Sequence, residues 1–218
     1  MAFNELNFLK RRGITLYLDV GANIGQTGTR LLRGGFLGRI QSFEPIPDCF
    51  GKLQDAARNA PGWSVMHAAI GDRDGTASLG VSANFVSSSL RPATDLLVAI
   101  HEPVRYTAQV EVPLRRLDGL FDWLAGPEDV VHLKIDTQGS EREVILGAEG
   151  CLSRIDSLRM EVAVSEVYKG EMLVPEAIVM MRERGFVLVE AFPAWRHPVT
   201  DEALHFDLVF RRGTLSAH

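Results

Sequence analysis

The sequence predicts an α/β fold built on a doubly wound sheet, and three observations carry this prediction. Short apolar runs alternate with helical patterns over residues 14–72, which is the β-α-β-α-β order of such a sheet. The first run passes into a glycine-rich turn, "LDVGANIGQTG" at 18–28, as expected where a parallel strand meets its helix. The same alternation returns from residue 117 onward.

The opening half consists of three strands and two helices. Apolar or β-branched content predicts the strands, and the helices are delimited by Gly34, Pro47 and Gly62. In chain order, we expect a strand at 14–20, a helix at 26–35, a strand at 39–45, a helix at 47–62 and a strand at 63–72.

The middle of the chain departs from this rhythm. Residues 74–81 and 105–117 show the alternation of exposed antiparallel strands, and the polar segment 82–95 separates them. We therefore expect a small β-hairpin insertion with a mobile loop.

The α/β pattern then resumes and closes the domain. We expect helices at 117–126, 140–152 and 174–185, and strands at 129–137, 157–164, 186–192 and 203–212.

Composition is consistent with one domain over residues 1–218, whose core covers about residues 15–211. Hydrophobic residues make up 46% of the chain and charged residues 23%, a normal globular balance. The net charge is −5 and no long basic cluster occurs, so a nucleic acid is not an expected partner. The short basic stretches at 9–13 and 210–218 are interpreted as solvated ends.

Targeting signals and cysteine pairs are not evident. Cys49 and Cys151 lie far apart and have no CxxC partner, which favours a reducing compartment over a disulfide framework or a cysteine-based zinc site. The first residues contain no apolar signal-peptide segment, and no run is long enough to span a bilayer. We expect a soluble, cytoplasmic protein without a membrane partner, and a homo-oligomer is possible.

The glycine turn and the acid that follows it suggest a nucleoside site. Glycine admits positive φ and lets a ligand approach the backbone, and the next helix directs free N–H groups at it. Glu44 ends the next strand, 19 residues beyond Gly25 (44 − 25), where a carboxylate can accept both ribose hydroxyls.

Two details of the turn select among nucleoside cofactors. Asn23 stands where a dinucleotide fingerprint has its second glycine. Asp19 ends the strand directly before the turn, and a carboxylate there would repel a pyrophosphate. The same carboxylate suits a cofactor with an amino group and a sulfonium, which indicates S-adenosylmethionine (SAM).

Four stretches in this order resemble the FkbM family of SAM-dependent methyltransferases: "LDVGANIG", "FEP", "AAIGDRDG" and "LKIDTQGSEREVILGA". The resemblance covers roughly residues 15–210. It implies a class I methyltransferase fold, with a sheet of about seven strands whose last strand is antiparallel. It also implies O-methylation of a hydroxyl on a sugar or a polyketide-type natural product, a small-molecule acceptor.

The resemblance carries over to individual cofactor residues. Asp19, Gly21, Asn23 and Gly25 match the family's cofactor turn, and Glu44 matches its ribose acid. The alternatives are an ordinary tight turn for the glycines and a solvated strand end for Glu44.

A second group of residues ends the strand at 129–137. Lys134 and Asp136 point to one face of a predominantly apolar strand, where charges are costly unless paired or functional. The resemblance places Asp136 near the methyl group as a base or an orienter of the acceptor. Our hypothesis adds Lys134 as the residue that tunes Asp136. A buried structural ion pair is the alternative. Glu141 is expected to start a helix.

Gln138 departs from the family pattern, which usually has Glu at this position. The change removes one carboxylate next to Asp136 and weakens a metal-site interpretation. Dependence on Mg²⁺ is possible, but the sequence shows no clear ligand set and we assign no metal-binding residue.

The remaining candidates are a glutamate and three histidines. Glu161 matches an acid in the family's fifth strand and is a third candidate catalytic residue. His67 lies near the end of the third strand and either contacts adenine or is structural. His132 is expected to be structural, and the surroundings of His205 are open.

Two loops are candidates for contact with the acceptor. Residues 84–92 could form a lid or an acceptor-binding loop, or be a flexible surface loop. Residues 192–203, which include Trp195 and His197, could contact the acceptor or a subunit partner. Two other functions stay open: a catalytically inactive SAM-fold binding module and an NAD-dependent oxidoreductase.

Overall fold

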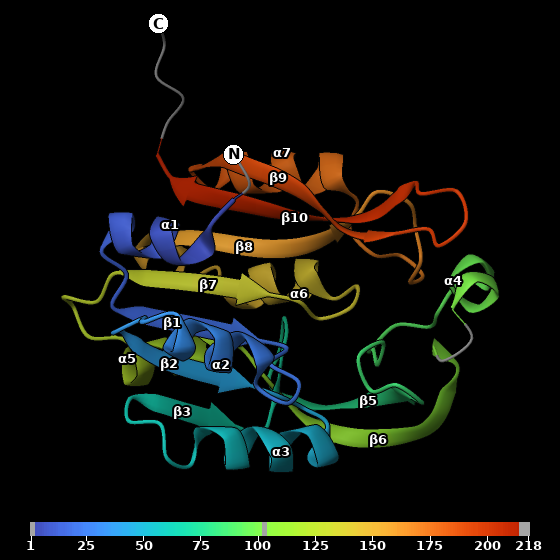
Figure 1. Cartoon of the computed structure of the whole chain (residues 1–218), viewed down its shortest axis with the longest axis horizontal. Coiled ribbons are helices and arrows are strands. Elements are labelled where there is room, and N and C mark those ends of the chain that lie inside the picture. The colour runs from blue at the N-terminus through green and yellow to red at the C-terminus, as the bar shows by residue number, and fades with distance from the viewer. Residues whose placement is uncertain (1–2, 102–103, 214–218) are drawn as a thin grey trace, which may run out of the picture.

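The structure, a computed structural model, describes residues 3–101 and 104–213, and its centre is a seven-stranded sheet (Figure 1). Pairing is parallel from β3 to β8, whereas β10 runs antiparallel to both β8 and β9. The predicted sheet with an antiparallel last strand is confirmed. The strand order is β3 (Trp63–Met66), β2 (Arg39–Phe43), β1 (Leu16–Val20), β7 (Val131–Ile135), β8 (Ile155–Ala163), β10 (Ala203–Arg212) and β9 (Phe186–Arg196).

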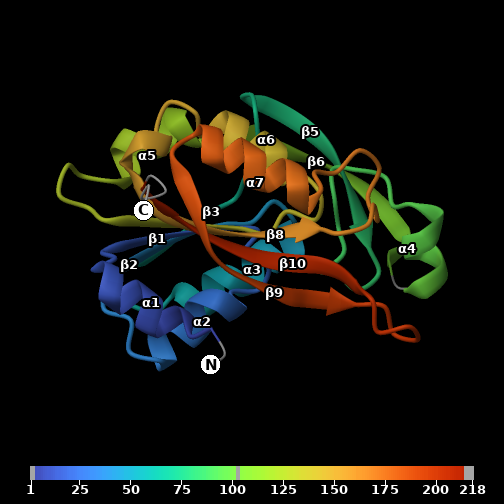
Figure 2. The same ribbon diagram turned by 90° about the horizontal axis from the view of Figure 1, so that it is seen from above.

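Helices cover both faces of this sheet (Figure 2). One face carries α1 (Glu5–Arg12), α2 (Gln26–Arg33) and α3 (Pro47–Ala57); the other carries α5 (Leu117–Leu124), α6 (Glu141–Gly147) and α7 (Val174–Glu183). All but α1 were predicted, although α6 ends early and a 3₁₀ turn (Leu152–Arg154) follows it. No helix within the described ranges is long and apolar enough to cross a lipid bilayer.

The helix α1 is absent from the sequence-based prediction. The side chain of Asn4 caps its first turn by accepting a hydrogen bond from the Asn7 N–H (2.9 Å), and Gly13 ends it in the left-handed conformation. Phe8 and Leu9 are buried between the helix and the sheet. The amino-terminal segment therefore belongs to the packed core.

The two basic stretches at the chain ends are also less solvated than predicted. Arg12 Nε donates to the Asp156 carboxylate (2.9 Å). Arg212 Nε donates to the carbonyl of Ile155 (3.0 Å), and its guanidinium also reaches Leu152. The interpretation as solvated ends is wrong for these two arginines. Residues 214–218 lie outside the described residues.

A second, three-stranded sheet contains β5 (Gly75–Ser82) and β6 (Tyr106–Arg115), which pair antiparallel and confirm the hairpin insertion. The strand β4 (Ala69–Ile70) pairs with β6 in parallel. The single strand predicted at 63–72 is therefore wrong, because its two halves belong to different sheets. The chain turns at His67, whose ring nitrogen hydrogen-bonds the carbonyl of Pro45 (2.8 Å).

The connection between β5 and β6 contains a further helix, α4 (Asp95–Ile100), which begins at the end of the predicted polar segment and lies in a stretch to which the sequence analysis assigned no element. Thr94 caps it by accepting from the Leu97 N–H (3.3 Å). The small sheet and α4 lie beyond the carboxyl ends of the parallel strands (Figure 1). Ligands bind at this end of α/β sheets, so the insertion forms one side of the candidate site.

Alternate residues of β1 face opposite sides of the sheet. Leu16, Leu18 and Val20 belong to the large apolar cluster that includes residues of α5, α6 and α7. Tyr17 and Asp19 are equally buried but face the side of α1 and α2. That side therefore contains polar groups, which must be paired.

Glu5 on α1 is the centre of one such buried group. Its carboxylate accepts a hydrogen bond from the Tyr17 hydroxyl (2.9 Å) and pairs with Arg30 of α2 (2.7 Å) and Arg159 of β8 (3.1 Å). Arg159 also pairs with Asp207 of β10 (3.1 Å). The contacts join α1 and α2 to three strands of the sheet.

We predict that Glu5→Gln lowers the free energy of unfolding by about 3 kcal/mol, because it leaves Arg159 with one buried partner instead of two. Urea denaturation measures this loss. The matched control is Asp55→Asn, which removes an exposed i,i+3 partner of Arg58 and should cost less than about 1 kcal/mol. Equal losses in the two variants would mean that the Glu5 contacts do not hold α1 in place.

Candidate functional site

The turn from β1 to α2 needs glycine for reasons internal to the protein. Gly21 has φ 76°, and a Cβ at this position would lie 1.8 Å from the backbone oxygen of Asp136. Gly25 has φ 89°, and a Cβ there would lie 2.9 Å from the ring of Trp63. Only glycine combines a positive φ with the absence of a Cβ at such short distances. The sequence predicted that a ligand approaches the backbone at these glycines; at Gly21 and Gly25 it is the protein's own atoms that do so.

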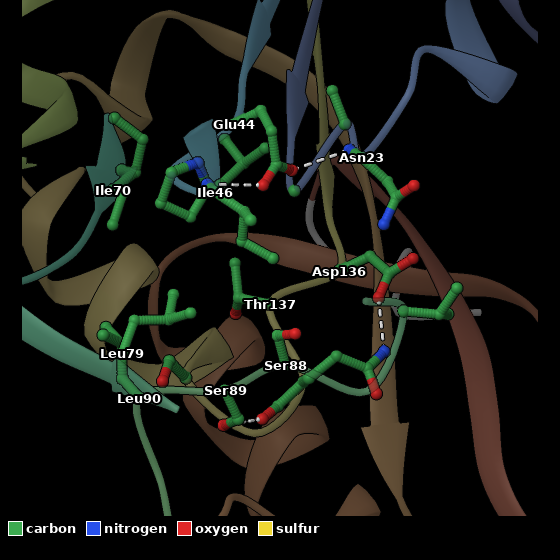
Figure 3. Close-up of a pocket in the computed structure, with 18 of the residues that line it drawn as sticks. Asn23, Glu44, Ile46, Ile70, Leu79, Ser88, Ser89, Leu90, Asp136 and Thr137 are labelled. Carbon is green, nitrogen blue, oxygen red and sulfur yellow. Dashed lines mark hydrogen bonds between the residues drawn. The ribbon is translucent and has the colours of Figure 1, made fainter. Parts of the chain in front are cut away.

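Glu44 closes the turn from the side of β2. Its Oε2 accepts the N–H of Asn23 and its Oε1 accepts the N–H of Ile46, both at 2.8 Å (Figure 3). Burial raises the pKa of Glu44 to about 7, although these two N–H groups act in the opposite direction. Each carboxylate oxygen has a second lone pair that can accept another hydrogen bond.

A cavity of about 240 Å³ lies between this turn and the small sheet. Figure 3 shows Glu44 and Asp136 on its polar walls, facing an apolar side that includes Ile70, Leu79 and Leu90. Its lining includes Gly21, Asn23, Glu44, Lys134 and Asp136 from the residues expected to form the site. We call it the first cavity. An apolar wall opposite a buried carboxylate suits a nucleoside.

Asp19 lies behind the first cavity and does not line it. Its side chain is 0% exposed, and its Oδ1 lies 3.1 Å from the ammonium of Lys134. The predicted contact between Asp19 and the amino-acid tail of a cofactor therefore stays a prediction. In this structure the Asp19 carboxylate faces the ammonium of Lys134, which does line the cavity.

Lys134 is buried at the junction of the turn and β7. Its Nζ donates to the carbonyl of Gly21 (2.9 Å) and lies 3.1 Å from Asp19 and 3.5 Å from Asp136. Burial alone would lower its pKa, but the two carboxylates outweigh burial and raise it. The ammonium group fixes the Gly21 carbonyl and both acids.

Asp136 follows β7 and contacts side chains on both sides of it. Its Oδ1 accepts from the amide of Gln138 (2.8 Å), and its side chain is 32% exposed. Gln138 has φ 55° and accepts from the Tyr168 hydroxyl (3.0 Å). Although burial acts upward, Lys134 and Gln138 hold the pKa of Asp136 below its ordinary value.

A second cavity of about 380 Å³ lies on the other side of Asp136. Val86, Asp136 and Gln138 line both cavities, so the two adjoin at these residues. The rest of the second cavity is lined by Asn84, Ser87, Leu97, His101, Glu161, Tyr168, Trp195 and His205.

Both loops singled out in the sequence reach this region. Residues 84–90 line the first cavity with Phe85, Ser88 and Ser89, among others, and the second with Asn84 and Ser87. From residues 192–203, Trp195 reaches the second cavity, whereas the ring of His197 accepts hydrogen bonds from its own loop.

The remaining candidates have distinct places. His67 stacks on Phe50, with ring centroids 4.8 Å apart, and lies outside the lining of the first cavity. His132 is buried against the Ser157 hydroxyl (2.9 Å), and burial lowers its pKa to about 4, as suits the structural role expected of it. Glu161 lines the second cavity.

Glu141 opens α6, as expected, and its carboxylate accepts the N–H groups of Thr137 (2.9 Å) and Gly139 (3.2 Å). Burial raises its pKa to about 7. It therefore shapes the loop that carries Gln138. Within residues 3–101 and 104–213, no three His, Cys, Asp or Glu side chains are grouped in a way that could hold a metal ion.

Two sequence relatives carry methyltransferase names. The chain is 28% identical over 185 residues to "2-O-methyltransferase NoeI" of Sinorhizobium fredii, covering 81% of this chain and 74% of the relative. It is 25% identical to "Methyltransferase 1" of Beauveria bassiana, covering 83% of this chain and 76% of that protein.

Solved structures share the fold at low identity. An rRNA methylase from Streptococcus thermophilus aligns with a TM-score of 0.53 and 8% identity, over 98% of this chain and 99% of that one. M. capricolum TrmK, solved with S-adenosylhomocysteine (SAH), aligns with a TM-score of 0.52 and 7% identity, over 100% of this chain and 72% of that one. The fold is that of the class I SAM methyltransferases.

The sequence profile of the FkbM methyltransferase domain matches residues 19–188. This range includes the turn after β1, Glu44, Asp136 and the loop between β5 and β6. This chain belongs to the FkbM methyltransferase family.

Proposed function

We propose that this protein transfers the methyl group of SAM to a hydroxyl group of a small molecule, with a sugar or a polyketide-type natural product as the acceptor. The observation that carries the proposal is the junction of two cavities at Asp136. One cavity has the features of a nucleoside site, and the other is lined by polar and aromatic side chains. The relative named as a 2-O-methyltransferase supports oxygen as the accepting atom.

The first cavity fits SAM by the chemistry of its walls. The buried carboxylate of Glu44 would accept the ribose hydroxyls, and Ile46, Ile70 and Leu79 would contact the adenine ring. The turn at Gly21 and Asn23 would contact the amino-acid end. When bound, SAM supplies an electrophilic methyl group.

Asp136 is the residue that would act on the acceptor. Its carboxylate lies where the cavities meet, and it would accept a hydrogen bond from the acceptor hydroxyl. The hydroxyl proton would pass to a carboxylate oxygen of Asp136 as the hydroxyl oxygen is methylated. Because its pKa lies below the ordinary range, Asp136 is a weak base, and orientation of the acceptor is the larger part of its contribution.

Lys134 serves this step without contacting the acceptor oxygen. Its ammonium fixes the Asp136 carboxylate from behind and, through the Gly21 carbonyl, fixes the turn. The hydrogen bond from Gln138 fixes the other carboxylate oxygen. The acid is therefore oriented before the acceptor arrives, as preorganised catalysis requires.

We predict that Asp136→Asn lowers kcat about 100-fold or more, because it removes the carboxylate that orients the acceptor hydroxyl and takes its proton, and changes SAH affinity less than about threefold. Radiolabelled methyl transfer and calorimetry measure the two effects. Asp122→Asn, an exposed position on α5, is the control and should keep full activity. An Asp136→Asn enzyme with normal kcat would exclude Asp136 from the reaction.

The titration of Glu44 should make the affinity for the cofactor depend on pH. With a pKa of about 7, Glu44 is ionised above this pH and can then accept both ribose hydroxyls; below it, a proton occupies one of these positions. SAH should bind about tenfold more weakly at pH 6 than at pH 8. Calorimetry across this range tests the prediction.

Glu44→Gln provides the control for this titration. Its SAH affinity should be low and independent of pH between 6 and 8. The free wild-type protein should lose stability as the pH rises from about 4.5 to about 7, because Glu44 and Glu141, whose pKa values are raised on folding, favour the folded state only while they are protonated. Glu44→Gln should remove only the Glu44 part of this loss. A pH dependence of SAH affinity that survives in Glu44→Gln would assign the binding titration to another group.

A further inference from the structure

A chain of three ionisable side chains lies in the wall of the second cavity, away from the first. His205 of β10 places its Nδ1 2.9 Å from Oε1 of Glu161 on β8. Its Nε2 lies 3.6 Å from Oε2 of Glu171, in the segment before α7. His205 and Glu161 line the second cavity and neither lines the first.

His205 is held as a cation by this geometry. Both ring nitrogens face a carboxylate, so the ring donates in both directions only when it is doubly protonated. Burial alone would lower the pKa of His205, but Glu161 and Glu171 outweigh it and raise the pKa to about 10. The other ring beside it is Trp195 of β9, 5.9 Å away between centroids. An imidazolium cannot take a proton from the acceptor.

Glu171 is fixed from behind. Its Oε1 accepts the N–H groups of Val167 (2.6 Å) and Tyr168 (2.8 Å), and its side chain is almost fully buried. The carboxylate is therefore a rigid support for the imidazolium, which in turn orients Glu161. Glu171 in the interior therefore holds His205, and His205 holds Glu161 at the cavity wall.

Glu161 is the member of the chain that can reach a ligand. Its side chain is 22% exposed and lines the second cavity. Oε1 is engaged by His205, and none of the described residues donates a hydrogen bond to Oε2. Asp136 differs, because Gln138 engages one of its oxygens and Lys134 lies against the other.

The position of Glu161 separates its role from that of Asp136. A group that acts on the reacting hydroxyl must lie at the junction of the cavities, and Asp136 does. Glu161 lines only the second cavity, so its oxygen would meet another part of the acceptor. A carboxylate accepts hydrogen bonds and donates none, so that part must be a donor.

We propose that Glu161 is a specificity-determining residue that accepts a hydrogen bond from a second hydroxyl of the acceptor, and that His205 and Glu171 are the positioning residues that hold it. The proposal rests on the proposed methyl transfer to a hydroxyl. It identifies the acceptor as a polyhydroxylated compound. It also gives Asp136 and Glu161, the two partly exposed carboxylates of the second cavity, different roles.

The first test is kinetic and uses methyl hexopyranosides with their monodeoxy analogues as acceptor probes, together with labelled SAM. For the wild type, removal of one hydroxyl other than the methylated one should raise KM about tenfold, the cost of a lost hydrogen bond to a charged group. In Glu161→Gln and His205→Asn, KM for the parent compound should rise about tenfold as well, and kcat should change less than about threefold. In these two variants, removal of the same hydroxyl from the acceptor should raise KM little further. Glu190→Gln on β9 is the matched control.

The second test needs no acceptor. Nitrogen NMR of the His205 ring should show an imidazolium that persists to pH 8 and above in the wild type, and a titration shifted to lower pH in Glu161→Gln and in Glu171→Gln. A wild-type ring that titrates at the ordinary pH of histidine would overturn the positioning role. So would a titration unchanged by either substitution.

The outcomes separate this proposal from the one on which it rests. If the wild type fails to bind SAH, or binds it and methylates no hydroxyl, the proposed function is wrong. If it methylates a hydroxyl but neither the deoxy analogues nor Glu161→Gln alter KM, the second-hydroxyl assignment is wrong and the methyltransferase assignment stands. Unaltered SAH affinity in Glu161→Gln is expected in every case, because this residue does not line the first cavity.

Discussion

The site depends on the contacts of one buried ammonium group, that of Lys134. It donates to the carbonyl of Gly21 and pairs with the carboxylates of Asp19 and Asp136. Without this cation, two acids would lie close together in a region of low dielectric, where an unpaired charge is costly. With it, the end of β1 and the end of β7 become one rigid unit, and the two cavities have a fixed common wall.

The carboxylates around the two cavities differ in what their surroundings allow. Glu44 is desolvated and accepts only neutral backbone N–H groups, so its pKa rises. Asp136 faces an ammonium and an amide, and its pKa falls. Glu161 faces an imidazolium that a third acid supports. The same functional group, a carboxylate, can therefore serve the three different contacts proposed for Glu44, Asp136 and Glu161, because each has different partners.

Much of the fold and part of the site follow from the sequence. Strand-helix alternation predicts the sheet, and the 19-residue spacing from Gly25 places Glu44 at the turn. The i,i+2 spacing places Lys134 and Asp136 on one face. The surroundings of Asp19 could not be predicted, because the sequence shows that an acid precedes the turn but not that this acid is buried against Lys134.

Other features depend on tertiary contacts. The helix α1 has local signals in Asn4 and Gly13, but this short polar segment is held on the sheet because Glu5 contacts Tyr17 and Arg159, which are largely buried, and also pairs with Arg30. Residues 63–72 read as one strand because their apolar content is continuous, and only pairing with β6 divides them. The Glu171–His205–Glu161 chain depends on His205 of β10, which is distant in sequence from both glutamates, so no local pattern reveals it.

The contact between Gly21 and the Asp136 carbonyl affects how the protein can change by substitution. Any side chain at position 21 would displace the end of β7, and with it the acid. The cofactor half of the site is therefore intolerant of gradual change. Residues 84–90 and the β9–β10 edge carry no such restriction, so new acceptor preferences can arise there while the methyl-donor half stays the same.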